Sequence, residues 1–410
     1  MTFLYDVAVV GLGAAGSAAA SELARRGVRV LGVDRWAPPH AHGSTHGRTR
    51  IIREAYYEHP LYVPLVRRAY ELWGRLEEEA GETLFRQAGG LMVGPADGPL
   101  VAGARRSAEE HDIPHELLDA AQVRARFPAY APPADAVALL EPRAGLLFPE
   151  ACVAAFLARA RQLGATLELG AAVESWTAGD GGVTLTTARG TFRAARAIFA
   201  AGPWLPELVP ALAPALEVER QLFHWFDPAD GERARHAPER MPIALWEYAP
   251  ERIFATFPDV GDGVKCGVHH EGETTTADAV RRTIDEEETR QARALLAALM
   301  PGAAGALRDR ATCLYTNTPD HHFLIDRLPG AERVIVASPC SGHGFKFASA
   351  VGELLAQMAV GEAPRFDVAP FGLARAAMEE RLRDEARGER HEVGRGTTDT
   401  PPEHAPGSRH

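Results

Sequence analysis

The chain has 410 residues, of which 46% are apolar and 24% charged, an ordinary composition for a globular protein that is long enough for two domains. Its formal net charge of −11, from 44 basic and 55 acidic residues, argues against a nucleic-acid partner or an anionic membrane surface. The four cysteines form no CxxC pair, so neither a zinc ribbon nor a dense disulfide framework is indicated, and free thiols are typical of a reducing compartment.

The N-terminal residues show no basic start, apolar segment and cleavage site in succession, which argues against a secretory signal. The sequence also has no uninterrupted apolar run of about 18 residues, the length that a membrane-spanning helix requires. We therefore expect a cytoplasmic protein without a membrane partner.

The chain begins with a predicted strand, glycine turn, helix and second strand. Residues 5–10 form an unbroken apolar run, which is typical of a strand that is buried on both faces. Glycines interrupt the run, an alanine-rich helix is predicted over residues 17–26, and a second strand is predicted over residues 28–33. The proline- and glycine-containing segment 36–49 is predicted to be a loop.

Helices and strands alternate along the rest of the chain. Helical periodicity predicts helices over residues 62–80, 151–164, 276–299 and 348–360. Strand patterns are found over residues 166–169, 183–187, 191–194, 197–201, 245–269 and 334–337, and a glycine-containing loop follows over 341–344. The tail, residues 388–410, is rich in Gly, Pro, Thr, His and charge, which predicts disorder.

Gly11, Gly13 and Gly16 form a GxGxxG motif between the first strand and the first helix. Glycines there permit a tight turn and a close approach of the backbone to a pyrophosphate, which would face the free N–H groups of the helix N-terminus. Asp34 ends the second strand, where a carboxylate suits an adenosine ribose and would repel the 2′-phosphate of NADP. The motif predicts dinucleotide binding rather than a glycine-rich turn of another α/β protein, and it leaves FAD and NAD open.

Three further segments are more specific. They read Gly-Ser-Thr-His-Gly-Arg-Thr-Arg-Ile-Ile-Arg over residues 43–53, Cys-Leu-Tyr-Thr-Asn-Thr-Pro-Asp over 313–320, and Ser-Gly-His-Gly-Phe-Lys-Phe over 341–347. In this order behind the glycine motif, they resemble the monomeric sarcosine oxidase and N-methyltryptophan oxidase family of FAD-dependent amine oxidases. The resemblance extends from about Tyr5 to about Phe371, nearly the whole chain before the tail.

The resemblance implies roles for individual positions. Cys313 matches the cysteine that binds the flavin covalently, and Arg53 and Lys346 match the pair that holds the substrate carboxylate. Lys265 matches the lysine that activates oxygen beside the flavin. The other implied catalytic or substrate positions are Arg50, Tyr56, His269, Gly342, Leu245 and Ala255. The implied cofactor-binding set is Gly11, Gly13, Gly16, Asp34, Ser44, His46, Thr49, Gly344 and Phe345, together with Cys313.

Each of these residue types also has a simpler interpretation. The fork of an arginine such as Arg53 suits a carboxylate, yet an arginine on a loop is more often a solvated surface group. Lys265 equally fits an outward-facing strand position, and a single buried cysteine such as Cys313 is usually a small hydrophobic residue. The histidines of loop 36–49 match no helix face and precede no carboxylate partner, so we expect no metal site.

The sequence departs from the family in two places. Residues 44–48 read Ser-Thr-His-Gly-Arg, with an arginine where family members have an acidic residue, so this loop gains positive charge. A pocket tyrosine of sarcosine oxidase falls on Ala255, and a pocket methionine falls on Leu245. These two changes remove a polar group and volume from the pocket wall, so we expect a substrate that is larger or more apolar than sarcosine.

We therefore expect an α/β fold with two intertwined lobes. A Rossmann-like FAD lobe would comprise residues 1–85, 147–215 and 310–375. A substrate lobe with a mixed or antiparallel sheet would comprise residues 86–146 and 216–309. The chemistry would take place where the lobes meet, in a monomer.

The expected activity is oxidation of a secondary amino acid, such as sarcosine or N-methyltryptophan, with FAD as cofactor and O2 as electron acceptor. The products would be an imine, which hydrolyses to formaldehyde and an amino acid, and hydrogen peroxide. Three alternatives stay open: an oxidase of a cyclic amino acid such as pipecolate, a flavin dehydrogenase with another electron acceptor, and a dinucleotide-binding module without turnover.

Overall fold

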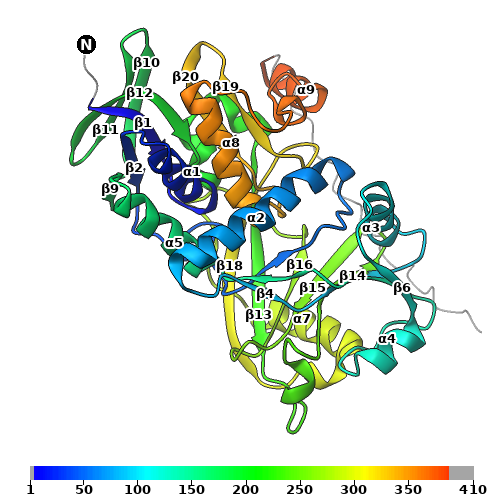
Figure 1. Ribbon diagram of the computed structural model, residues 1–410. Coiled ribbons are helices and arrows are strands. Elements are labelled where there is room, and N and C mark those ends of the chain that lie inside the picture. The colour runs from blue at the N-terminus through cyan, green and yellow to red at the C-terminus, as the bar shows by residue number, and fades with distance from the viewer. Residues whose placement is uncertain (1–3, 387–410) are drawn as a thin grey trace, which may run out of the picture.

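The computed structural model describes residues 4–386, which form two lobes joined by several crossings of the chain (Figure 1). The first lobe contains an eight-stranded sheet in the order β10-β11-β12-β1-β2-β9, with β20 beside β12 and β19 beside β20. β12, β1, β2, β9 and β20 run parallel. The strands are β1 (Tyr5–Val10), β2 (Val30–Asp34), β9 (Thr166–Leu169), β10 (Val173–Gly179), β11 (Gly182–Thr187), β12 (Gly190–Phe199), β19 (Leu324–Leu328) and β20 (Ala331–Ser338).

Both faces of this sheet are covered, as its unbroken apolar strands require. In β1, Val7 and Val9 pack into one core, whereas Ala8 and Val10 pack into another. The first core is closed by α1 (Ala14–Arg25), α2 (Val63–Ala80), α5 (Pro149–Gln162) and α8 (Ala348–Val360). The second core includes residues of α6 (Leu205–Leu208), of the segment that follows it, and of α9 (Ala376–Ala386).

The second lobe is built on a nine-stranded, mainly antiparallel sheet in the order β17-β13-β16-β15-β14-β5-β7-β6, with β18 beside β13. Its strands are β5 (Gly90–Gly94), β6 (Glu116–Asp119), β7 (Val137–Glu141), β13 (Glu217–Phe226), β14 (Ile243–Ala249), β15 (Arg252–Phe257), β16 (Val264–His269), β17 (Thr274–Thr275) and β18 (Leu307–Asn317). The helices α3 (Pro99–Glu110), α4 (Ala120–Arg126) and α7 (Glu286–Leu299) belong to this lobe (Figure 1). A small sheet, β3-β8-β4, completes the fold with β3 (Arg50–Ile52), β4 (Phe85–Gln87) and β8 (Gly145–Leu147).

The α/β class predicted from the sequence is confirmed, and several predicted elements need correction. Residues 191–194 and 197–201 were expected as separate strands, but β12 runs through both because its first half pairs with β11 and its second half with β20. Residues 310–317, which we expected in the FAD lobe, are part of β18, whose ladder with β13 places them in the second sheet. Pattern reasoning did not predict α3, α4, β13 or β18. The tail from residue 388 lies outside the described residues.

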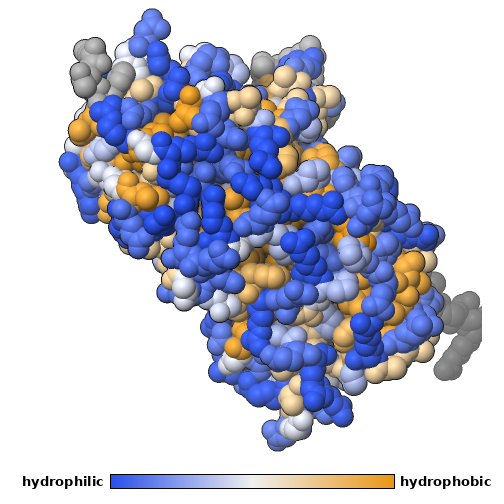
Figure 2. Space-filling view, viewed as in Figure 1, coloured by the Kyte–Doolittle hydropathy of each residue, from blue (hydrophilic) through white to orange (hydrophobic). Residues whose placement is uncertain are grey.

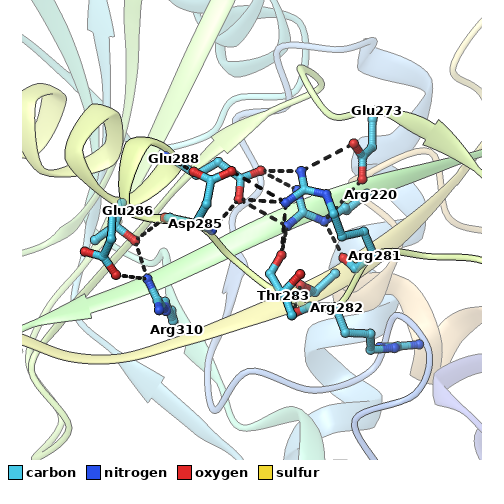
Figure 3. A network of polar contacts seen from close by, with 11 residues as sticks. Arg220, Glu273, Arg281, Arg282, Thr283, Asp285, Glu286, Glu288 and Arg310 are labelled. Atoms are coloured by element: carbon cyan, nitrogen blue, oxygen red, sulfur yellow. Dashed lines mark hydrogen bonds and ion pairs between the residues drawn. The ribbon is translucent and has the colours of Figure 1, made fainter.

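The predicted helix over residues 276–299 is also too long, because α7 begins only at Glu286 (Figure 3). Asp285 and Glu288 form a capping box that starts the helix. Before this point, the carbonyl oxygens of Arg281 and Thr283 accept hydrogen bonds from the buried guanidinium of Arg220. These carbonyl groups are therefore turned toward a side chain of β13 instead of forming helical hydrogen bonds.

The surface carries mostly hydrophilic residues on the face seen in Figure 2, with smaller hydrophobic areas between them. Within residues 4–386, no helix has the length and apolar character needed to cross a lipid bilayer.

Candidate functional site

A single continuous cavity of about 740 Å³ extends from the glycine motif of the first lobe to the sheet of the second lobe. At one end it is lined by Gly11, Gly13 and Asp34, and at the other by Arg53, Lys346 and His269. A cavity of this size lies in the range of small-molecule and cofactor sites.

The glycine end is shaped by close backbone packing. Gly11 has φ +85°, and a side chain there would place its Cβ atom 2.5 Å from the carbonyl oxygen of Ala200. α1 begins at Ala14, whose N–H group donates to the hydroxyl of Thr45 (3.3 Å), and Gly13 provides no side-chain cap for the N–H groups that follow, which can face an anion. Asp34 accepts hydrogen bonds from the backbone of Leu12 (2.7 Å) and Trp36 (2.8 Å), which holds the carboxylate at the end of β2.

Aromatic and charged side chains flank the cavity beyond Asp34. The rings of Trp36 and Trp204 lie 4.6 Å apart, and the guanidinium of Arg35 lies over Trp36. Asp278, which comes from the second lobe, accepts hydrogen bonds from Arg35 (2.9 Å) and from the indole of Trp204 (2.8 Å). Nearby, Arg282 donates to the carbonyl oxygens of Ala41 and His42. The segment before α7 is thus attached to the first lobe at this end.

In the middle of the cavity, two cations hold the loop that precedes β3. Lys265 donates to the carbonyl oxygens of Gly47 (2.8 Å) and Thr49 (2.7 Å), and Arg50 donates to those of Thr49 and Ser44 (both 2.9 Å). No carboxylate within the described chain forms an ion pair with Lys265, and its ammonium lies over the ring of Phe223. Burial, and then the charge of Arg50, hold the pKa of Lys265 well below its usual value.

Cys313 lies behind this loop. Its Sγ atom is 3.6 Å from the carbonyl oxygen of Ser44 and 3.6 Å from a guanidinium nitrogen of Arg50. Burial raises the pKa of the thiol, while Arg50 opposes that shift. Ser44 and Arg50 line the cavity, whereas Cys313, which contacts both, is not among the lining residues of the described chain.

At the second-lobe end, Arg53 and Lys346 lie almost fully buried, with exposed fractions of 2% and 5%. Arg53 donates to both carboxylate oxygens of Glu58 (2.8 and 2.6 Å). Lys346 donates to the carbonyl oxygen of His343 (2.7 Å) and contacts the hydroxyl of Tyr56 (3.4 Å). Burial, and then the charge of Arg53, lower the pKa of Lys346 to about 7. This end of the cavity therefore contains Arg53, which is paired with Glu58, and Lys346, which has no carboxylate partner in the described chain.

His269, Tyr315 and Gly342 close this end of the cavity. The Nδ1 atom of His269 and the hydroxyl of Tyr315 are 3.1 Å apart. Burial lowers the pKa of His269 well below its usual value, and neighbouring cations and histidines add to the effect, so the ring is neutral. Gly342 has φ +75°, and a Cβ atom there would lie 2.7 Å from the ring of His269, so the position requires glycine.

One wall of the cavity is formed by neighbouring residues of three adjacent strands. Leu245 of β14 is paired with Ala255 of β15, which is paired with Gly267 of β16. Because side chains alternate along a strand, Lys265, Gly267 and His269 point to this same face. Small and apolar residues therefore line the wall beside the polar groups.

The structure brings most of the predicted site residues to the cavity, but not all. The wall formed by the described residues includes Gly11, Gly13, Asp34, Ser44, Arg50, Arg53, Leu245, Ala255, Lys265, His269, Gly342, Gly344, Phe345 and Lys346. Gly16, His46, Thr49, Tyr56 and Cys313 do not line it in this part of the chain. Gly16 packs against the backbone of Gly11, and Tyr56 lies behind His343, with 2.5 Å between its hydroxyl and Nδ1.

Two carboxylates and a histidine were missed by sequence reasoning. Glu58 neutralises Arg53, and Glu141 accepts hydrogen bonds from the backbone of Glu54 and Ala55, which positions the loop after Arg53. His343 donates through Nε2 to the carbonyl oxygen of His321 (3.0 Å), so its Nδ1 accepts from Tyr56. Only the position of His343 inside the glycine loop, residues 341–344, was a signal in the sequence.

Unpartnered polar atoms support a dinucleotide ligand in this cavity. Within the described residues, Ser44 Oγ lines the cavity and is buried without a hydrogen-bond partner; His46 Nε2 and Thr49 Oγ1 of the same loop also have none, but they lie outside the lining. Together with the N–H groups that follow Ala14 in α1 and the carboxylate of Asp34, Ser44 fits a ligand that carries both phosphates and polar groups. The fold and the cavity thus define a dinucleotide-dependent oxidoreductase.

Comparisons with known proteins specify the class. The family model described as FAD dependent oxidoreductase matches residues 6–358, and the chain belongs to this family. It is 41% identical over 364 residues to a monomeric sarcosine oxidase of Streptomyces avermitilis, covering 88% of this chain and 94% of that relative. It is 37% identical over 373 residues to an N-methyl-L-tryptophan oxidase of Salmonella heidelberg, covering 90% and 99%. The family predicted from the sequence motifs is confirmed.

Solved structures share the fold. NikD, described as an unusual amino acid oxidase essential for nikkomycin biosynthesis, has a TM-score of 0.78 and 26% identity, covering 90% of this chain and 98% of its own. L-proline dehydrogenase from P. horikoshii has a TM-score of 0.79 and 21% identity, covering 95% and 100%, which is a likeness of fold alone.

Proposed function

We propose that the protein is an FAD-dependent oxidase of secondary amino acids, either N-methyl or cyclic. The observation that carries this proposal is the arrangement of Arg53 and Lys346 in one wall of a cavity that continues to the glycine motif. Two buried cations in one wall are stabilised by an anion, and an amino-acid carboxylate matches the fork of Arg53. The sequence identities to a sarcosine oxidase and an N-methyl-L-tryptophan oxidase support the same substrate class.

In this proposal, the substrate carboxylate displaces Glu58 from Arg53 and binds Lys346 as its second partner. The carbonyl oxygen of Gly342 and the ring of His269 face the amine, and the cations of the wall favour its unprotonated form. Bound FAD supplies the acceptor for the electron pair and hydrogen that leave the α-carbon or N-methyl carbon. The protein holds that carbon in position and excludes water.

The oxidant in this proposal is O2, and Lys265 serves that half-reaction. It lies buried against aromatic rings without a counterion in the described chain, where a developing negative charge on oxygen would find a fixed donor. Such a charge also restores the protonated form of the lysine, which burial and then the charge of Arg50 disfavour. Hydrogen peroxide is the expected product.

We also propose that Cys313 carries FAD covalently. The thiol lies beside Ser44 and Arg50, and Arg50 opposes the effect of burial on the thiolate, which would form a carbon–sulfur bond with bound FAD. A C–H bond of the flavin would break in this step, its electron pair would reduce the flavin, and O2 would reoxidise it. Acid precipitation of the purified protein tests this attachment. Yellow colour should remain in the pellet and move to the supernatant in Cys313→Ala, and flavin freed from the unmodified protein would contradict it.

The function itself is tested with purified, yellow protein and a panel of N-methyl and cyclic amino acids, read by anaerobic bleaching of the flavin and by peroxide in air. We expect bleaching and peroxide with an amino acid that is larger or more apolar than sarcosine, because Leu245, Ala255 and Gly267 form the wall. If primary amines without a carboxylate bleach the flavin equally well, the amino-acid assignment is wrong. Bleaching without peroxide would favour the second candidate, a dehydrogenase with another acceptor.

A further inference from the structure

A series of histidine rings leads away from the second-lobe end of the cavity, which contains His269 and Gly342 and is called the amine end from here on. His270 follows His269 at the end of β16 with φ +57°, and the two ring centres lie 4.2 Å apart. The ring of His321, which is exposed at the surface, lies 4.6 Å from His270. The three imidazoles therefore connect the cavity wall with solvent.

A buried carboxylate orients the central ring. Glu219 of β13 accepts hydrogen bonds from Gln221 (2.6 Å), the backbone of Gly272 (2.7 Å) and Asn317 (2.7 Å). Its fourth partner is Nδ1 of His270, at 3.3 Å. When His270 donates through Nδ1, its Nε2 atom carries the free lone pair. That nitrogen faces Gly342, since a Cβ atom built on Gly342 would lie 2.8 Å from it.

The two neighbouring rings have different hydrogen-bond partners, because His270 contacts the carboxylate of Glu219 whereas His269 contacts the hydroxyl of Tyr315. Burial raises the pKa of Glu219, but the contacts with His270 and Gly272 outweigh it, so the pKa lies below its usual value and the group is charged. His269 lies closer to the cavity, where burial, then the neighbouring His270 and, to a smaller extent, Lys346 and Arg53 hold its pKa well below the usual value. The groups that face His270 are Glu219 from β13, His269 from β16, Tyr315 from β18 and His321 from the following loop.

We propose that the Glu219–His270 pair accepts the proton that the bound secondary ammonium group must lose before it can be oxidised, and that His321 passes it to solvent. The inference rests on the proposed function. The substrate ammonium loses one N–H bond to His269, the ring of the series that lines the cavity, and His269 passes the proton to Nε2 of His270, where one N–H bond forms. Glu219 remains a carboxylate that stabilises the imidazolium. Neither Glu219 nor His270 lines the cavity within the described residues, so both act through His269 as positioning groups for the proton.

The test is the pH dependence of anaerobic flavin reduction in the holoenzyme, measured by stopped flow between roughly pH 6 and pH 10. Glu219→Gln keeps the shape of the side chain but removes its charge. We expect the apparent pKa of the reduction step to rise by about one unit, so that reduction below it becomes about tenfold slower while the limiting rate at high pH is unchanged. His270→Gln should give a similar or larger shift.

Two controls separate this effect from a structural one. Glu271→Gln removes a neighbouring exposed carboxylate that contacts Tyr248 and Arg252 instead, and its profile should match the unmodified protein. A cyclic amino acid whose amine is already unprotonated at neutral pH should reduce the flavin equally fast in Glu219→Gln and in the unmodified protein.

An unchanged profile in Glu219→Gln and His270→Gln would overturn the relay, as would a lower limiting rate at high pH without a shift. If Glu219→Gln does not fold, the profile of His270→Gln decides between these outcomes. If no secondary amino acid bleaches the flavin of the unmodified protein, the proposed function fails first, and that result is distinct from a failure of the relay alone.

Discussion

The two ends of the cavity are built in different ways. At the glycine end, backbone atoms of one continuous segment, β1 to β2, form the surface, and their geometry depends on glycine and on a helix terminus. At the amine end, side chains from the segment after β3, from β16 and β18, and from the segment before α8 meet, and buried charges hold one another in place. Ligand binding to a surface of backbone atoms depends little on any single side chain. Ligand binding to a surface of buried charged side chains depends on each of them.

The sequence contains only two lysines, Lys265 and Lys346, and both lie in the cavity wall. Every other basic side chain is an arginine, including those on the surface. A lysine differs from arginine in that burial shifts its pKa readily, which makes these two positions sensitive to charge in the cavity. Three substitutions and one pH titration compare the two ends of the cavity, and their expected effects on rates and affinities decrease from Lys265→Met to Asp278→Asn.

Lys265→Met should have the largest effect. It keeps the length of the side chain and removes the charge where oxygen would become negative, so reoxidation of reduced flavin by O2 should slow by about 10²–10³-fold. Anaerobic reduction by substrate should change far less. Two stopped-flow measurements on the same preparation give both rates. Equal losses would show that Lys265 acts on the flavin or substrate in general, and no loss would move the oxygen site elsewhere, with Arg50 the next candidate.

Arg53→Lys should weaken substrate binding by about ten- to a hundredfold, because a charged hydrogen-bond pair contributes about 1.5–3 kcal/mol and lysine lacks the fork. The dissociation constant follows from the substrate dependence of anaerobic reduction. Arg308→Lys provides a matched control, since Arg308 is exposed and contacts Asp227. Equal affinities in Arg53→Lys and the unmodified protein would remove Arg53 from the proposed carboxylate site.

Binding of a simple carboxylate inhibitor should depend on pH through Lys346. Its pKa is lowered to about 7 by burial and then by Arg53, so the lysine is protonated below that pH and neutral above it. Bound carboxylate raises the pKa, so affinity should be highest below pH 7 and fall by up to about tenfold per pH unit above it. Flavin absorbance measures binding. Because the chain has two lysines, isotope-labelled lysine gives two NMR signals, and Lys346→Met assigns them and should abolish the pH dependence.

Asp278→Asn should have the smallest effect. Its contacts with Arg35 and Trp204 attach the second lobe beside the glycine end, but Arg35 and Asp278 are largely exposed. An exposed ion pair contributes about 0–1 kcal/mol, so flavin dissociation in a Cys313→Ala background should accelerate by about five-fold at most, and less at high salt. If Asp278→Asn loses flavin as completely as a variant with a side chain at Gly11, flavin binding at the glycine end also depends on single side chains.

The glycine end was predictable from the sequence because every part of it is local. The apolar strand, the turn at Gly11–Gly16, the helix and the acid at Asp34 follow one another within 34 residues, and β1 and α1 lie close to where the pattern placed them. The family motifs extended this prediction to the identity of Arg53, Lys265 and Lys346. Their contacts, however, were not contained in any motif.

Only the tertiary structure decided which side chains meet at the amine end. Glu141 supports the backbone of Glu54 across 87 positions of the chain, and Tyr56 reaches His343 across 287. Glu219 meets His270 across 51 positions through strands of the second sheet. Local patterns carry no information about such pairs, because strand order and the docking of two lobes determine them. The sequence by itself determined the cofactor class and the family, and the packing of the two lobes decided how charge and protons are arranged around the amine.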